Sequence, residues 1–274
     1  MNKIIINNKI KQLKKREKKE LYNYLKTKNF HNFLEPIEED RTYEIYPNTP
    51  DILPKKDKAI ELMYVIALLH NKTTTYEDLN INKIKEIYEK YKQEIFKIKD
   101  YYYSLQDRFE DNIYLLPAEY LLLRNISNIY KLINKSEELL DKWYTLKQND
   151  FKIRKCLLHQ NLNIDNLKQI NNELFLTNWD NYKEDLVIYD FINFYKNEYK
   201  TIEMTSLFDL YLSKYPLNNT EITLLLSILA IPPKVLFNKT NYENTVNIKY
   251  LTIYVEKTFL FISKYYKENQ KPNY

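Results

Sequence analysis

Apolar residues recur at helical spacing through most of the chain. In residues 57–70, for example, Ile60, Tyr64 and Ala67 fall on one side of a helix. Pro117 begins another stripe, and proline is favoured in a helix's first turn. The stripes predict helices over residues 57–70, 82–103, 117–146, 189–200, 204–214, 220–229 and 246–266.

A few segments outside these stripes predict other local structure. Residues 10–30 are predicted to form an N-terminal helix, with Leu13 on its apolar side. Short extended segments are predicted near Phe33 and over residues 42–46. Residues 152–180 contain short apolar segments bounded by Asn-rich turns, which favours a hairpin.

A connector at residues 48–54, rich in proline, separates two parts of the chain. We therefore predict a predominantly helical α+β protein. Its small N-terminal part would comprise residues 1–47, and its helical body residues 48–274, interrupted by the hairpin at 152–180.

The sequence contains no glycine, although average usage of about 7% predicts roughly nineteen in a chain of this length. The abundance of Lys, Asn, Ile and Tyr indicates a bias towards A/T-rich codons. Every residue has a Cβ, so a glycine-rich loop that brings backbone N–H groups against phosphates cannot form. Asn is expected at left-handed turn positions instead.

The net charge is +5, and much of the excess lies in a basic run near the N-terminus. We interpret this run as the solvated face of the N-terminal helix. Contact with nucleic acid or an anionic membrane surface is the alternative. The basic run comprises Lys9, Lys11, Lys14, Lys15, Arg16, Lys18 and Lys19.

The single cysteine, Cys156, rules out an intramolecular disulfide and fits a reducing compartment. The chain has three histidines, and they are widely separated in the sequence, which argues against a metal centre with several His ligands. No apolar run is long enough for a signal peptide or a transmembrane helix. These features predict a cytoplasmic protein without a transmembrane segment.

One stretch has the spacing of a phosphotransferase catalytic loop. Kinases carry H-R-D-x-x-x-x-N, where Asp accepts the proton of the substrate hydroxyl and Asn holds magnesium. His159 stands at the His position, Asn161 at the Asp position and Asn166 at the Asn position. A second metal-binding Asp is expected about a dozen residues later, and Asn178 lies there.

Asn178-Trp179-Asp180 and then Asp190 follow in the order of an I-D-W-E/D pattern and a later acid. Together these positions resemble the aminoglycoside phosphotransferase and choline kinase branch of the protein-kinase-like fold, over roughly residues 43–266. The segment 68–73 and the Tyr-rich helical middle look most like CotS-type spore coat proteins of Firmicutes. The resemblance implies a kinase-like C-lobe with a truncated N-lobe, and it implies that Asp190 braces the catalytic loop.

The departures from that pattern change the expected activity. Asn161 has no useful basicity, so it cannot accept the hydroxyl proton. Asn178 offers one neutral oxygen to a cation that prefers carboxylates. The residues before 48 are too few for a complete N-lobe, in which Lys9 or Lys11 would sit on a remnant of the strand that carries the nucleotide-binding lysine.

These features predict a catalytically inactive kinase-like protein, or pseudokinase. It would act as a binding or scaffold module, without a cofactor, in spore coat or envelope assembly. A protein segment or small molecule would occupy its vestigial cleft. The degenerate site positions are His159, Asn161, Asn166, Asn178, Asp180 and Asp190, with Asn166 and Asn178 as vestigial metal ligands.

Two alternatives remain open. The chain could be an active small-molecule phosphotransferase that uses ATP and magnesium, with Asp165 or Asp180 as an unusual base and Asn166 on the metal. It could instead bind nucleic acid or a membrane surface through the basic run, although no RNA-binding motif supports a nucleic-acid partner.

Overall fold

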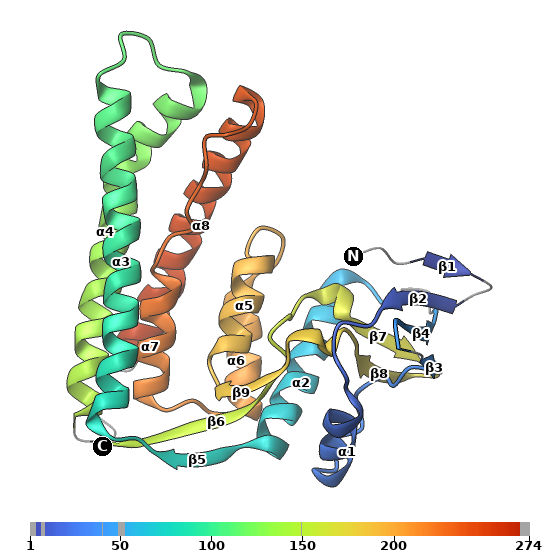
Figure 1. Ribbon diagram of the computed structural model, residues 1–274. Coiled ribbons are helices and arrows are strands. Elements are labelled where there is room, and N and C mark those ends of the chain that lie inside the picture. The colour runs from blue at the N-terminus through green and yellow to red at the C-terminus, as the bar shows by residue number, and fades with distance from the viewer. Residues whose placement is uncertain (1–3, 7–8, 40, 49–52, 149, 269–274) are drawn as a thin grey trace. The chain divides into compact units, whose positions relative to one another are not determined.

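The computed structural model describes residues 4–6, 9–39, 41–48, 53–148 and 150–268. The chain divides into two compact units (Figure 1). Unit 1 comprises Met1–Tyr76, Arg154–Asn197 and Ile202–Pro216, and unit 2 comprises Glu77–Ile153, Glu198–Thr201 and Leu217–Tyr274. The boundary expected after residue 47 concerns lobes within this fold and stays a prediction.

Unit 1 begins with a four-stranded antiparallel sheet in the order β1-β2-β4-β3. Its strands are β1 (Ile4–Ile6), β2 (Lys9–Leu13), β3 (Glu38–Glu39) and β4 (Tyr43–Pro47). The extended segment predicted at 42–46 is therefore confirmed. Gln12 on β2 lies opposite Glu44 on β4, which places both side chains on one face of the sheet.

The helix predicted over residues 10–30 is wrong in its first half. Helix α1 is shorter, Lys19–Thr27, and the residues before Lys14 form β2. Leu13 is half-exposed, whereas Gln12 next to it is buried. That alternation is the pattern of a strand, and pairing with β4 outweighs the helical spacing of a few leucines.

Residues 152–186 contribute strands to two separate sheets. β7 (Leu167–Ile170) pairs antiparallel with β8 (Glu173–Leu176), and β6 (Lys152–Leu158) pairs with β9 (Lys183–Leu186). The predicted hairpin therefore exists, but its first arm is β7 and not the apolar segment in β6. The segment near Phe33 forms only a single bridge, to Leu176.

Three helices complete unit 1 or lead out of it. They are α2 (Lys55–Thr73), α5 (Tyr189–Glu198) and α6 (Met204–Lys214). A short strand, β5 (Thr75–Asp78), follows α2. His70 on α2, Asp190 on α5 and Tyr211 on α6 are all buried, so the interior of unit 1 contains polar as well as apolar groups.

Unit 2 is a helical bundle, in which α3 and α4 lie side by side (Figure 1). Its helices are α3 (Ile81–Glu110), α4 (Pro117–Lys147), α7 (Asn219–Leu229) and α8 (Asn241–Glu268). Asn80 and Asn218 cap α3 and α7 by accepting backbone N–H bonds. All four helices were predicted from the apolar stripes. Within the described residues, no helix is long and apolar enough to cross a membrane.

Residues with positive φ in the described part of the chain are Asn29, Gln160, Asn171, Asn172 and Asn178. Four of the five are Asn, as expected for a chain without glycine. Asn171 and Asn172 form the two-residue connection between β7 and β8, with φ of 49° and 64°. Two successive positive φ values are the geometry of a type I′ hairpin turn.

We expect Asn172→Gly to stabilise the protein by roughly 0.5–1 kcal/mol, because glycine adopts this left-handed position without a Cβ contact. Asn23→Gly is the matched control, since Asn23 is exposed on α1 and should lose roughly 0.3–0.5 kcal/mol. Urea unfolding measures both. A decrease in the stability of Asn172→Gly would contradict the assigned turn.

Candidate functional site

The buried carboxylate of Asp190 holds the loop that carries the kinase-like spacing. Its Oδ2 accepts a hydrogen bond from the backbone N–H of His159 at 2.8 Å, and its Oδ1 accepts from that of Gln160 at 2.7 Å. Gln160 has a φ of 61°, so the chain turns sharply here. The structure thus brings Asp190, at the start of α5, to the bracing position that the resemblance implied.

His70 joins the same carboxylate from α2. Its Nε2 lies 3.2 Å from Asp190 Oδ2, and its Nδ1 lies 2.7 Å from the hydroxyl oxygen of Tyr211. A neutral ring with the proton on Nε2 satisfies both contacts, because it donates to the carboxylate and accepts from the tyrosine. Asp190 on α5 is thereby linked to α2 through His70, and His70 in turn links to α6 through Tyr211.

His159 is fully buried, and its Nε2 lies 2.9 Å from the backbone oxygen of Thr177. The ring also packs edge-on against Trp179, with centroids 4.7 Å apart. Burial lowers the pKa of the imidazole from its usual 6.5, against the opposing effect of Asp190. His159 therefore acts as a neutral link between the loop and the end of β8.

Asn166 makes a second link of this kind. Its side-chain Nδ2 donates to the backbone oxygen of Asn161 at 2.6 Å. Its backbone oxygen accepts from the N–H of Thr177 at 2.8 Å. The positions expected to hold a base and a metal are thus neighbours, but the amide of Asn166 is used within the loop.

Asn178 directly follows Thr177 and adopts the left-handed conformation, with φ of 66° and ψ of 51°. Its side-chain oxygen is buried without a hydrogen-bond partner in the described part of the chain. The catalytic-loop and metal positions predicted from the sequence are therefore gathered in one region, but neither amide supplies a negative charge.

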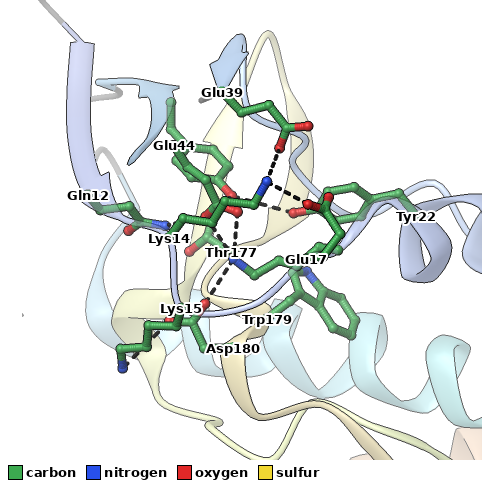
Figure 2. A network of polar contacts seen from close by, with 12 residues as sticks. Gln12, Lys14, Lys15, Glu17, Tyr22, Glu39, Glu44, Thr177, Trp179 and Asp180 are labelled. Atoms are coloured by element: carbon green, nitrogen blue, oxygen red, sulfur yellow. Dashed lines mark hydrogen bonds and ion pairs between the residues drawn. The ribbon is translucent and has the colours of Figure 1, made fainter. Parts of the chain in front are cut away.

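A buried ion cluster lies next to this region, formed by Lys18, Glu44 and Asp180. Figure 2 labels its two acids, Glu44 and Asp180. Lys18 Nζ lies 2.7 Å from Glu44 Oε2 and 2.9 Å from Asp180 Oδ1. The side chains of all three residues are at most 2% exposed. Lys18 precedes α1, Glu44 lies on β4, and Asp180 lies in the short turn Trp179–Asn181 after β8.

Neutral donors complete the surroundings of Glu44. Its Oε2 accepts from the Tyr46 hydroxyl at 3.1 Å and from the Gln12 side-chain amide at 3.4 Å. Burial raises the pKa of Tyr46, so its hydroxyl stays protonated and keeps donating. Lys15 Nζ, on a half-exposed side chain, lies 3.7 Å from Asp180 Oδ2.

Lys9 and Lys11 both lie on strand β2, and the assignment of this strand as a remnant of the lysine strand stays a prediction. Lys9 pairs with Glu38 at 2.5 Å on the exposed side of the sheet, and Lys11 lies over the Tyr43 ring. Within the basic run, the buried lysine is Lys18. The basic run is therefore not the solvated face of one helix, because it spans a strand and a loop before α1 and includes a buried ion pair.

The donor set of this region does not fit a divalent metal ion. Asn178 contributes a neutral oxygen, and the Asp180 carboxylate already faces an ammonium at 2.9 Å. Among the residues that the structure describes, no three His, Cys, Asp or Glu side chains gather in a metal-binding arrangement. A second cation beside Lys18 would meet repulsion at close range in a poorly solvated site.

No protein-family profile and no curated protein sequence matches the chain. Several solved structures do match. An aminoglycoside phosphotransferase from Alicyclobacillus acidocaldarius superposes with a TM-score of 0.69 at 9% identity, over 98% of this chain and 92% of that chain. An AMP-bound spectinomycin phosphotransferase gives a TM-score of 0.56 at 16% identity, over 92% and 87% of the two chains.

A glucosamine kinase in complex with glucosamine, ADP and inorganic phosphate gives a TM-score of 0.52 at 8% identity, over 97% of this chain and 80% of that one. At these identities the likeness shows the fold alone. The chain has a predominantly helical α+β fold of the protein-kinase-like type, which confirms the fold class predicted from the sequence.

Asp190→Ala is expected to destabilise the protein by about 3–5 kcal/mol, because it leaves two buried backbone N–H groups and His70 without their acceptor. Asp165→Ala is the control: Asp165 is exposed, and surface changes usually stay within about 0.5 kcal/mol. Chemical denaturation measures both. A loss below about 1 kcal/mol for Asp190→Ala would contradict the bracing role.

The lowered pKa of His159 makes the stability depend on pH. Above pH 6.5 both folded and unfolded chains carry a neutral imidazole; as the pH falls towards the lower folded pKa, only the unfolded chain gains the proton. Stability should therefore fall by up to about 1.4 kcal/mol per pH unit from this group.

His159→Gln should remove that slope, whereas His31→Gln, an exposed control, should keep it. Unfolding curves from pH 5 to 7.5 decide between them, and parallel slopes would refute the assignment.

Proposed function

We propose that this protein is a kinase-like binding module that does not transfer phosphate. The observation that carries the proposal is the pairing of Asp180 with the buried ammonium of Lys18, beside amides at the base and metal positions. A kinase-type reaction needs a carboxylate to orient and deprotonate the acceptor, and acidic ligands for magnesium. Asn161 and Asn178 supply neither.

The N-terminal sheet supports the same proposal. It retains four strands and one helix in the described residues, but the chain contains no glycine. A glycine-rich loop lets backbone N–H groups approach phosphate oxygens closely, and a Cβ at each position prevents that approach. The protein would therefore retain the kinase-like framework without the usual glycine-rich loop that binds phosphate.

The module's partner would be a protein segment or a small molecule held in the vestigial cleft. The resemblance to CotS-type spore coat proteins suggests assembly of a spore coat or envelope inside the cell as the setting. That resemblance rests on sequence positions 68–73 and 157–190, and it is part of the proposal.

The rival proposal is an active phosphotransferase with an unusual base. The observation in its favour is the exposed carboxylate of Asp165, one residue before Asn166. Asp180, the other candidate base, is already paired with the Lys18 ammonium at 2.9 Å and lies 3.7 Å from that of Lys15. The basic run is a poorer candidate for nucleic acid, because Lys9, Lys14 and Lys18 form ion pairs with glutamates.

We expect ATP with magnesium to raise the melting temperature by less than about 1 °C, because the site lacks metal ligands. A nucleotide bound at about 100 times its Kd would give a shift of roughly 5–10 °C. Differential scanning fluorimetry with ATP, with and without magnesium, makes the comparison. A saturable, magnesium-dependent shift of several degrees would contradict the proposal.

A transfer assay with labelled ATP tests the chemistry itself. Sugars, choline and aminoglycosides serve as acceptors, and we expect no labelled product. Label transfer that is lost in Asp165→Ala or in Asp180→Ala would establish the rival proposal and identify its base.

A further inference from the structure

In the ion cluster of Lys18, Glu44 and Asp180, two carboxylates bind one cation, and that cation is a lysine side chain of the same protein. The buried carboxylates of Glu44 and Asp180 both lie within 3 Å of the Lys18 ammonium, at 2.7 and 2.9 Å. The three residues come from the start of α1, from β4 and from the turn after β8. All three belong to unit 1.

The two carboxylates are satisfied in different ways. Glu44 accepts hydrogen bonds from Tyr46 and Gln12 in addition to the lysine. Neither oxygen of Asp180 has a hydrogen bond of good geometry in the described part of the chain, so its partners are the two ammonium groups of Lys18 and Lys15. A buried carboxylate supported by charge alone depends strongly on its cation.

The charges of the cluster leave no place for a second cation. Glu44 and Asp180 together carry two negative charges, Lys18 compensates one, and Lys15 lies 3.7 Å from Asp180 Oδ2 at the exposed edge. A divalent ion on Asp180 would lie close to the Lys18 ammonium with little water to screen the repulsion. Binding such an ion therefore requires the lysine to leave.

We propose that Lys18 is the built-in cation of this site, and that its ammonium takes the place of a divalent metal ion between Glu44 and Asp180. Removal of the lysine side chain then exposes a latent divalent-cation site formed by the two carboxylates. The buried oxygen of Asn178, two residues before Asp180, is a further candidate ligand. The inference deepens the proposed function and rests on it, because both assign no metal ion to the native site.

The built-in cation also has a structural consequence. A metal ion exchanges with solvent, whereas Lys18 is covalently attached to the chain immediately before α1. The connection from β4 to the turn after β8 therefore does not depend on the concentration of any ion.

The test is binding of Mn²⁺ in the absence of nucleotide, on the full chain. In ¹⁵N-labelled native protein, we expect the paramagnetic ion to cause no selective broadening of the amide signals of Lys18, Glu44 and Asp180. In Lys18→Gln, we expect selective broadening at Glu44 and Asp180, and Mn²⁺ binding at least about tenfold tighter than in the native protein by electron paramagnetic resonance.

Two variants serve as controls. Lys15→Gln removes the other ammonium near Asp180, that of the half-exposed Lys15. This variant should bind Mn²⁺ no better than the native protein does, because Lys18 is still present. Lys18→Gln combined with Asp180→Asn removes a ligand of the latent site and should lose the gained binding.

Selective broadening at Asp180 in the native protein overturns the inference, and this measurement does not depend on whether any variant folds. A folded Lys18→Gln that binds Mn²⁺ no better than the native protein overturns it as well. These outcomes differ from the outcome that would refute the proposed function. The proposed function is refuted if the protein transfers phosphate to an acceptor. Native protein that binds Mn²⁺ at Asp180 yet transfers no phosphate would refute the built-in cation alone.

Discussion

The ammonium of Lys18 lies between two carboxylates that have been removed from water. Taking a charged group into a poorly solvated interior costs several kcal/mol, and the cost is offset only where the partners and hydrogen bonds are well placed. Here the partners are Glu44 at 2.7 Å and Asp180 at 2.9 Å. The start of α1, strand β4 and the turn after β8 must therefore stay together, which positions the N-terminal sheet against the loops of the candidate site within unit 1.

A second buried acid organises the other side of that site. Asp190 receives two backbone N–H groups of the loop and the ring of His70. This arrangement fixes the loop conformation without using any residue at the base position. The loop conformation therefore does not depend on a carboxylate at position 161 or 178.

The sequence predicted the parts of the structure that depend on neighbouring residues. Apolar spacing located the long helices, and the spacing from His159 to Asn178 identified the loop and the fold class. The sequence did not predict the partners of Lys18, because Glu44 is 26 residues away and Asp180 is far along the chain. Tyr211, the partner of His70, was missed for the same reason, because it lies 141 positions further along the chain. Lys18 also lies among other lysines, so nothing local distinguishes the buried one.

The helix predicted over residues 10–30 was wrong in its first half for a similar reason. There β2 satisfies its backbone by pairing with β4, a contact that no local pattern reveals.

The proposed binding module has a kinase-like framework in which the Lys18 side chain takes the place of an exchangeable ion. Crystals soaked with ATP and Mn²⁺ and measured at the manganese absorption edge test this proposal most directly. We expect Lys18 Nζ to contact both Glu44 and Asp180, with no anomalous peak at either carboxylate. An anomalous peak on Asp180, with Lys18 displaced and a nucleotide bound beside it, would contradict the proposal.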